Sequence, residues 1–401
     1  MSNSETAVQK GASAVIWIST LSMVIAFAVW AALSPLAAQL QKLYGLTATE
    51  KSVLVAIPVL LGSIMRIPLG ILTDRFGGRK VYSLLMLFLI APAIGLGYAN
   101  SYVSYITWAF LLGMAGTSFA IGISSVAKWY PPEKQGLVLG VTGMGNFGTA
   151  VAGFLLPTIA KQYGISWAFW SLVIPCALAA AAIFLFTRDP VGPKTVKTLQ
   201  EQFATMKQPM VWILSLFYFV TFGGFVSFSI YLPSLLVDVF GITPVDAGMR
   251  AAVFVVLATL ARPAGGYLAD RFGANKVLSF VFLLVSLSAV TLGLALGQLL
   301  LMTLVCLLAA VVVGIGNGAV FKLVPQYFPK TTGIVTGIVG AAGGIGGFFP
   351  PVVMGIVKDA TDGYALGFYL LLLFTLTCFL VKRGMGREQQ DGGKPHLRKA
   401  A

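Results

Sequence analysis

Charged residues are scarce in this chain of 401 residues. Only 10% of its residues are Asp, Glu, Lys or Arg, whereas 58% are hydrophobic, and the mean hydropathy is +0.90. A soluble globular domain of this length does not have such a composition. The composition therefore excludes a soluble enzyme and a soluble binding module.

Residue types that bind metals or carry out catalysis are also rare. The one histidine, His396, lies near the C-terminus, and the three cysteines, Cys176, Cys306 and Cys378, are far apart within apolar runs. These cysteines have no metal or redox spacing, so we expect small buried residues. No carboxylate pair, phosphate-binding loop or nucleophile constellation is present, and the Gly-x-Gly patterns do not follow a predicted strand. We predict that the protein is not an enzyme and that it binds neither a metal nor a cofactor.

Long apolar runs take up most of the chain. Each is about 18–25 residues long, which is enough to cross a hydrocarbon core about 30 Å thick. Because the runs are continuously apolar rather than alternating, they exclude a transmembrane barrel. We predict an all-α membrane protein with twelve transmembrane helices, at about residues 14–38, 52–72, 81–99, 103–126, 136–157, 166–186, 211–233, 247–269, 277–297, 299–324, 333–356 and 364–382.

Polar segments divide the predicted helices into two groups of six. Thr187–Pro209 is the one long polar stretch between apolar runs, and it is typical of a linker. The predicted segments are an N-terminal tail (1–13), a first six-helix bundle (14–187), a linker (188–210), a second bundle (211–382) and a C-terminal tail (383–401).

Basic residues predict the orientation in the membrane. Most of the 27 lysines and arginines fall in the tails, the linker and the loops on the same side, so we expect both termini in the cytoplasm. The net charge of +14 then reflects topology rather than nucleic-acid binding. Since Met1–Gly11 lacks a basic region before a short apolar run, we predict that the first span is not a cleaved signal peptide.

A repeat relates the two halves. The segment Gly70–Lys80 (GILTDRFGGRK) recurs as Gly266–Lys276 (GYLADRFGANK). Two six-helix halves related as parallel repeats are the plan of the major facilitator superfamily, and these segments resemble its Asp-Arg-x-Gly signature. The resemblance implies that the charged residues of the two loops tie neighbouring helix ends together in one access state. These residues are Asp74, Arg75, Asp270 and Arg271.

One arginine lies deep within a predicted span of each half. Arg66 and Arg262 each precede an Asp-Arg-Phe-Gly sequence by eight residues. At about 1.5 Å per residue, each lies roughly 12 Å from that polar boundary, which is a difficult distance for snorkelling. All 13 acidic residues lie in predicted loops, tails or span ends, so no carboxylate is at hand to pair with them. We predict a functional site; a partnered structural charge is the weaker alternative.

Glycines cluster in the fifth and eleventh predicted spans, where they let helix backbones approach closely. For any single glycine, ordinary helix packing is the alternative. The paired clusters resemble the nitrate signatures of nitrate/nitrite porters, and the segments Gly113–Ala120, Ser215–Phe225 and Gly314–Pro325 add to the likeness. The resemblance covers about residues 14–382 and is closest to the shorter bacterial type with one transporter per chain. The signature glycines are Gly140, Gly143, Gly145, Gly148, Gly337, Gly340, Gly343, Gly344, Gly346 and Gly347.

The residue chemistry suits a small planar anion. A guanidinium offers a rigid fork of donors that matches two oxygens of a flat oxyanion better than an ammonium does, so Arg66 and Arg262 can hold one anion between the halves. The resemblance implies aromatic faces from Phe119 and Phe222. Hydroxyl and amide groups of two further residues can donate to the anion. The alternatives are lipid-facing or core packing for the two phenylalanines, a satisfied buried hydroxyl for the tyrosine and an interhelical hydrogen bond for the asparagine. These further residues are Tyr218 and Asn146.

The lack of an interior carboxylate or histidine predicts exchange rather than proton coupling. Two unpaired cations disfavour occlusion until an anion compensates one of them, so we expect obligatory exchange of nitrate for nitrite. Nitrate–proton symport, transport of another anion and a nutrient sensor are the alternatives. Lys322 is the other ionisable group within a span, and its place near the inner end allows snorkelling.

The resemblance also implies the setting in which the protein works. We expect a multi-pass monomer in a bacterial cytoplasmic membrane, in contact with nitrate, nitrite and the lipid bilayer and with no nucleic acid.

Overall fold

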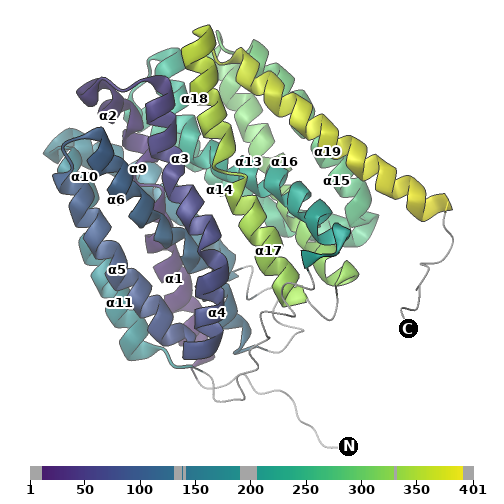
Figure 1. The fold of residues 1–401 in the computed structure, drawn as a ribbon, viewed down its shortest axis with the longest axis horizontal. Coiled ribbons are helices and arrows are strands. Elements are labelled where there is room, and N and C mark those ends of the chain that lie inside the picture. The colour runs from purple at the N-terminus through teal and green to yellow at the C-terminus, as the bar shows by residue number, and fades with distance from the viewer. Residues whose placement is uncertain (1–10, 131–137, 139–140, 190–205, 329–331, 392–401) are drawn as a thin grey trace, which may run out of the picture.

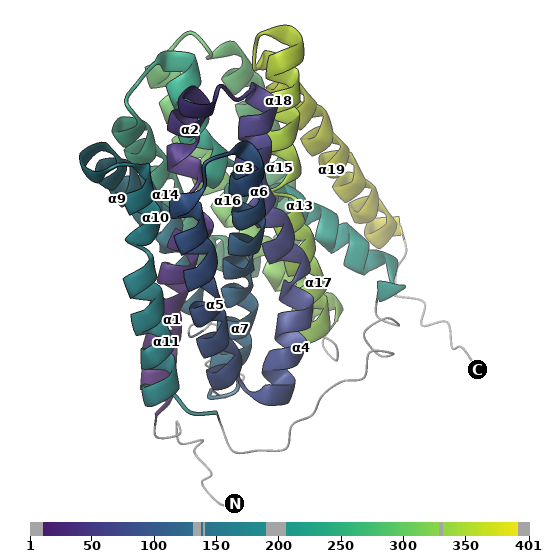
Figure 2. The ribbon, with the colours of Figure 1, turned by 60° about the vertical axis from the view of Figure 1, so that its left-hand side comes forward.

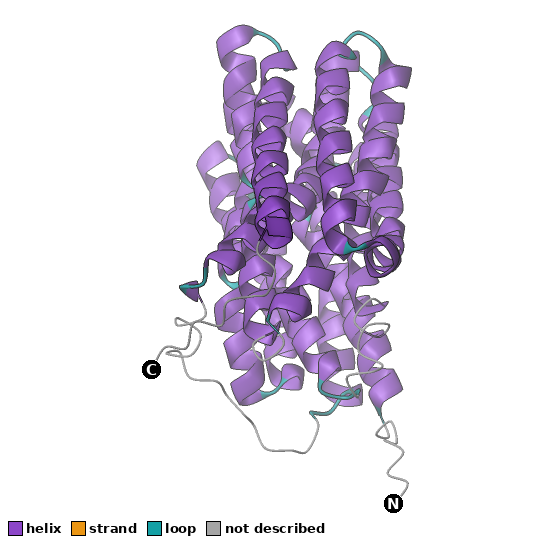
Figure 3. Cartoon of the chain, turned by 90° about the vertical axis from the view of Figure 1, so that its right-hand side faces the viewer, coloured by secondary structure: helices purple, strands orange, loops and turns teal. Residues whose placement is uncertain are grey.

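The computed structural model describes residues 11–130, 138, 141–189, 206–328 and 332–391 of the chain. Within these ranges every regular element is a helix, which confirms the predicted all-α class (Figure 3). The helices of the first half are α1 (Ala12–Trp30), η1 (Ser34–Leu36), α2 (Ala37–Tyr44), α3 (Ala48–Ile64), α4 (Arg66–Phe76), α5 (Gly78–Tyr98), α6 (Tyr102–Leu112), η2 (Gly113–Thr117), α7 (Ser118–Ala127), η3 (Met144–Asn146), α9 (Phe147–Tyr163), α10 (Ile165–Trp170) and α11 (Val173–Phe186). Those of the second half are α13 (Pro209–Phe240), α14 (Pro244–Phe272), α15 (Ala274–Leu294), α16 (Leu299–Tyr327), α17 (Thr332–Ile345), α18 (Phe349–Thr361) and α19 (Ala365–Asp391).

Eleven stretches of the described chain are long and apolar enough to cross a membrane. They coincide with eleven of the twelve predicted spans, and their ends differ by a few residues. The remaining predicted span, at about 136–157, lies partly outside the described residues. Its described part is η3 followed by α9, which crosses the bundle beside α1 and α14.

The two halves lie side by side, with the first half coloured from purple through blue to teal and the second from teal through green to yellow (Figure 1). Successive spans run in opposite directions, so the helix ends gather on two sides (Figure 2). We name the side with the start of α1 and the start of α13 the linker side, and the side with α2 and the end of α18 the distal side. Between the halves, α9 packs against α14, and α3 packs against α17 and α18.

Irregular turns interrupt several spans of the first half near mid-span. The turn at Met65 separates α3 from α4, the 3₁₀ turn η2 precedes α7, and η3 precedes α9. Each break carries a residue that the sequence singled out: Arg66 begins α4, Phe119 lies in the first turn of α7, and Asn146 ends η3. Non-helical backbone at this depth is tolerated where it lines a buried site.

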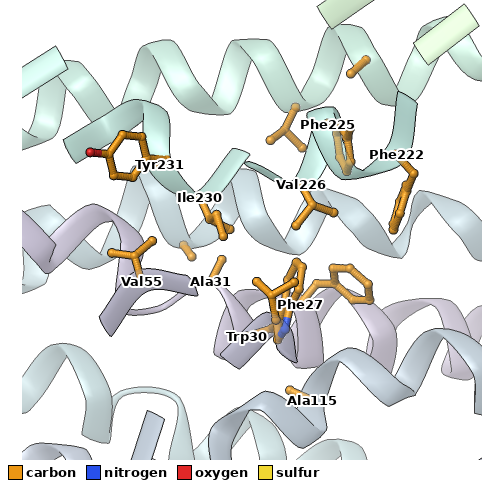
Figure 4. Packing of buried hydrophobic residues seen from close by; sticks show 14 of the residues in the cluster. Phe27, Trp30, Ala31, Val55, Ala115, Phe222, Phe225, Val226, Ile230 and Tyr231 are labelled. Carbon is orange, nitrogen blue, oxygen red and sulfur yellow. The ribbon is translucent and has the colours of Figure 1, made fainter. Parts of the chain in front are cut away.

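The apolar core continues across the boundary between the halves. Phe27, Trp30 and Val55 of the first half face Val226 and Ile230 of α13 (Figure 4). The indole Nε1 of Trp30 donates to the carbonyl of Pro58, 3.3 Å away. The three cysteines are buried, as predicted from the sequence. They are Cys176, Cys306 and Cys378.

Polar contacts join the halves at the distal side. Lys51 of α3 is fully buried and forms an ion pair with Asp238 at the end of α13. The hydroxyl of Tyr364, between α18 and α19, donates to the same carboxylate over 2.7 Å. Burial raises the pKa of the Tyr364 phenol, so this donor keeps its proton. We call Lys51, Asp238 and Tyr364 the distal latch.

Two further contacts support the latch. The Asp359 carboxylate of α18 accepts from the backbone N–H groups of Ala48 (3.1 Å) and Thr49 (2.8 Å), so the second half caps the N-terminus of α3. Next to it, the Ser52 hydroxyl lies 3.2 Å from the hydroxyl of Tyr231. These contacts, together with the latch, hold the two halves against each other at the distal side.

Candidate functional site

Arg66 lies between the two halves. Its side chain is buried, and its Nε donates to the carbonyl of Gly116 in the first half over 3.3 Å. Its Nη1 donates to the carbonyl of Gly340 in α17 over 3.0 Å, whereas its Nη2 is buried and has no partner among the described residues. Both acceptors are neutral carbonyls, so the positive charge stays uncompensated by any carboxylate in the described part of the chain.

Arg262 of α14 comes from the other half, and more of its guanidinium donors than those of Arg66 lack a hydrogen-bond partner among the described residues. Its Nε and Nη2 are buried, and neither has a hydrogen-bond partner within the described ranges. The guanidinium carbon lies 5.1 Å from the ring centre of Phe222 and 5.2 Å from that of Phe225. Aromatic faces attract a cation without removing its capacity to donate hydrogen bonds. Arg262 therefore keeps donors available for an acceptor.

The ring of Phe222 is shared by the two arginines. The guanidinium carbon of Arg66 lies 5.6 Å from this ring and 5.5 Å from that of Phe119. Tyr218, one turn earlier on α13, stacks on Phe222 with ring centres 4.9 Å apart and planes within 2° of parallel. The Tyr218 hydroxyl is in electrostatic range of both arginines. The structure thus brings five of the six predicted binding residues into one cluster.

Asn146 is the sixth. It is fully buried, and both atoms of its side-chain amide lack a hydrogen-bond partner in the described structure. It ends η3, which packs against α1 and against α14, the helix of Arg262. The role of Asn146 in binding stays a prediction.

The glycines of α17 lie against the arginine cluster. A methyl group on Gly344 would lie 3.0 Å from Nη1 of Arg66, and one on Gly343 would overlap the ring of Tyr218. Gly340 supplies the carbonyl that Arg66 contacts, while Gly337 has open space around it. Beyond them, a methyl on either of two further glycines would contact α13 closely. These two are Gly346 and Gly347.

The glycines of the first half pack mainly on α1. Gly148 lies against the backbone of α1 at Val24 and Ala28, and Gly145 lies against Met23. Gly143 has open space around it, and Gly140 lies outside the described residues. Here the glycines shape the packing of the span that carries Asn146.

The predicted conformational loops lie on the linker side. Gly77 and Gly273 end α4 and α14 with φ of 94° and 87°, a conformation that favours glycine. The guanidinium groups of Arg75 and Arg271 each lie 5.4 Å from the ring of the following phenylalanine. The side chains of Asp74 and Asp270 lie outside the described part, so the predicted tie between helix ends stays a prediction. Lys322 is exposed on α16.

Sequence reasoning missed several features of this region. It gave no indication that Lys51 and Asp238 pair across the halves. It also missed Phe225, the second ring under Arg262, and the carbonyls that hold Arg66. The aromatic run Phe217–Phe228 on α13 is the one sequence signal that could have indicated Phe225.

The two helical halves and the eleven stretches able to cross a membrane define a multi-pass membrane protein. The chain belongs to the major facilitator superfamily, which matches over residues 19–351 and 214–396 and comprises transporters rather than enzymes. Among solved structures, a bacterial homologue of the human lysosomal transporter Spinster aligns over 96% of this chain and 99% of its own (TM-score 0.75, 17% identity). A D-xylose–proton symporter aligns over 93% and 97% (TM-score 0.75, 16% identity). These likenesses show the fold alone.

Within the superfamily, the chain is similar to nitrate/nitrite porters along almost its whole length. It is 43% identical over 369 residues to the nitrite extrusion protein of Bacillus subtilis (strain 168), covering 91% of this chain and 92% of that protein. It is 41% identical over 364 residues to the probable nitrate transporter NarT of Staphylococcus haemolyticus (strain JCSC1435), covering 90% and 94%. The family resemblance predicted from the sequence is thus confirmed.

Proposed function

We propose that this protein exchanges nitrate for nitrite across a bacterial cytoplasmic membrane. The observation that carries the proposal is the pair of arginines, one from each half, that both lie against the ring of Phe222 and have no carboxylate partner in the described chain. The names of its relatives, a nitrite extrusion protein and probable nitrate transporters, support the choice of anion.

The site chemistry supports a flat anion of single charge. The donors left on Arg66 and Arg262 are of the kind that bind two oxygens of one oxyanion side by side. The faces of Phe119 and Phe222, already in contact with the guanidinium groups, fit a planar ion better than a tetrahedral one. Tyr218 and Asn146 would donate to the remaining oxygen.

The electrostatics of the site favour exchange over proton-coupled uptake. A guanidinium does not lose its proton in a protein, so neither arginine can be neutralised by pH. Closing the bundle around two uncompensated cations is unfavourable unless an anion accompanies them. The carrier then changes its access state only when it is loaded. The described acidic residues that form hydrogen bonds or ion pairs do not bond to the two arginines. Five of them lie at the distal side: Glu50, Asp238, Asp246, Asp359 and Asp362. The sixth, Asp189, accepts from the backbone N–H of Arg79.

Alternating access follows from the arrangement of the halves. We propose that bundles 14–187 and 211–382 rock about the central site, that the linker side faces the cytoplasm and that the distal latch opens when the site faces outward. The signature glycines would let α9 and α17 slide past α1 and α13 during this motion. A monomer is sufficient for this mechanism because both arginines come from one chain.

Arginine-to-lysine substitutions test the site. In proteoliposomes loaded with nitrite, Arg66→Lys and Arg262→Lys should each lower the exchange of labelled nitrate roughly 10- to 100-fold, because lysine keeps the charge but loses the fork. Arg250→Lys is a matched control, since Arg250 is bonded to Asp246 and Thr303 at the distal end of α14. Full exchange by both central variants would contradict the proposal.

Nitrate–proton symport is the second candidate, and the same vesicles distinguish the two. An exchanger takes up little nitrate into nitrite-free vesicles when only a pH gradient is imposed. Brisk uptake under those conditions would favour the symporter.

A further inference from the structure

A second buried amide lies beside the arginine cluster. Asn317 of α16 is 2% exposed, and both its Nδ2 and its Oδ1 lack a hydrogen-bond partner among the described residues. A buried amide without partners is costly, and more so in a membrane helix where water is scarce. Neither the two arginines nor the four other predicted residues account for it.

Helix geometry shows where the Asn317 side chain points. On one face of α16, a methyl on Gly316 would lie 2.6 Å from the Thr221 methyl group of α13. On another face, a methyl on Gly318 would lie 2.6 Å from the backbone nitrogen of Gly266 in α14. At about 100° per residue, Asn317 falls between these two faces. It therefore points into the wedge between α13 and α14.

A second contact of α16 indicates the same direction for the Asn317 side chain. Phe321 is one helical turn after Asn317 and shares its face. Its ring lies 4.8 Å from the ring of Tyr218, a member of the arginine cluster. Asn317 is thus on the face of α16 that turns toward the cluster, at the level of Thr221.

The side chain of Arg262 occupies the same wedge. It starts from α14 at the level of Gly318 and reaches the rings of Phe222 and Phe225 on α13. The hydroxyl of Thr221 is also buried without a partner. Unsatisfied donors and acceptors from α13, α14 and α16 therefore gather at one place, on the second-half side of the shared ring.

We propose that Asn317 is a further anion-binding residue, contributed by the second half. In the anion-loaded state its amide oxygen would accept from the Arg262 guanidinium and orient the fork, while its amide nitrogen would donate to an oxygen of the anion. Each half then supplies one guanidinium and one amide: Arg66 with Asn146, and Arg262 with Asn317. The inference rests on the proposed transport of nitrate and deepens it, because it adds a specificity-determining group.

Binding of sodium nitrate to the purified protein tests the proposal, with isothermal calorimetry as the readout. Asn317→Leu removes both polar atoms at similar volume and should weaken nitrate binding roughly 10- to 100-fold. Ser83→Ala, which removes another buried hydroxyl without a partner, is the control and should bind as the parent does. Unchanged binding by a folded Asn317→Leu variant would overturn the proposal.

A charged variant separates ligation from a merely structural role. In Asn317→Asp the new carboxylate would pair with the free donors of Arg262. The melting temperature without nitrate should then stay equal or rise, while the nitrate-induced rise is lost. A variant that melts lower and still responds to nitrate as the parent does would overturn the proposal. If the parent itself does not bind nitrate, the proposed function fails first, and the two failures are therefore distinguishable.

Discussion

Breaking the distal latch should shift the carrier toward the state in which its distal side is open. Lys51→Met removes the cation but keeps a long apolar side chain in a fully buried position. Removing one partner of a buried ion pair costs about 3–5 kcal/mol. Asp238 is 18% exposed and keeps its bond from Tyr364, so we expect about 2–3 kcal/mol here. That corresponds to a shift of roughly 30- to 160-fold in the equilibrium between distal-closed and distal-open forms.

Pulsed spin-label distances measure this equilibrium directly. Labels at Asn100 and Gln298, exposed in the turns before α6 and α16, report the separation of the halves at the distal side. The native cysteines are buried and can be replaced by alanine. The Lys51→Met protein should show a longer distance population that the parent lacks.

Two further variants make this experiment decisive. Arg250→Met breaks an ion pair with Asp246 inside α14 and should leave the distances unchanged, because that pair does not join the halves. The double variant Lys51→Met with Asp238→Leu should move back toward the parent, because it also removes the carboxylate that Lys51→Met alone leaves without its cation. An unaltered distance distribution in Lys51→Met would refute the idea that the pair holds the distal side closed.

Two substitutions test the remaining parts of the site. Gly344→Ala brings a methyl group 3.0 Å from Arg66 Nη1 and should reduce nitrate exchange at least about tenfold. The control Gly337→Ala places its methyl group in open space and should retain the exchange rate. Equal rates for the two variants would contradict the role of close packing. Phe222→Leu removes the ring shared by both arginines and should raise the half-saturating nitrate concentration roughly 5- to 30-fold. The control Phe280→Leu changes an exposed position of α15 and should leave that concentration unchanged. Similar values for both variants would argue against a role of the Phe222 ring in binding.

The fold and the two arginines could be predicted because their signals are periodic and repeated. Continuous apolar runs predict spans whatever the tertiary packing, and the duplicated Asp-Arg-Phe-Gly segment locates Arg66 and Arg262 at equal depth. The signature glycines predicted close helix contacts, and Gly343 and Gly344 do lie against Tyr218 and Arg66. Because such signals are local in the sequence, they can be interpreted without knowing which helices contact one another in the fold.

Contacts between distant segments could not be predicted in this way. Lys51 and Asp238 are 187 residues apart, and each alone is indistinguishable from an ordinary charge at a span end. Asn317 is a single amide in an apolar helix, and only the packing of α16 on both α13 and α14 indicates that it points between them. Phe225 likewise required knowledge of which face of α13 meets α14. Pairing across helices is a property of the tertiary fold, which one sequence does not encode as a pattern.

The cations at the distal side and at the centre of this protein are compensated differently, and that difference supports coupling of transport to binding. Lys51 has a permanent counter-charge in Asp238, so the distal side is stable without a ligand. Among the described residues, Arg66 contacts carbonyl oxygens and aromatic faces and Arg262 contacts aromatic faces, and these groups stabilise a cation without neutralising it. Under the proposed function, a mobile anion would supply the counter-charge of the centre, and it would contact both arginines only when the halves are together. Opening the distal latch breaks the ion pair between Lys51 and Asp238, which costs free energy. We infer that the free energy of anion binding at the centre offsets this cost in the loaded carrier.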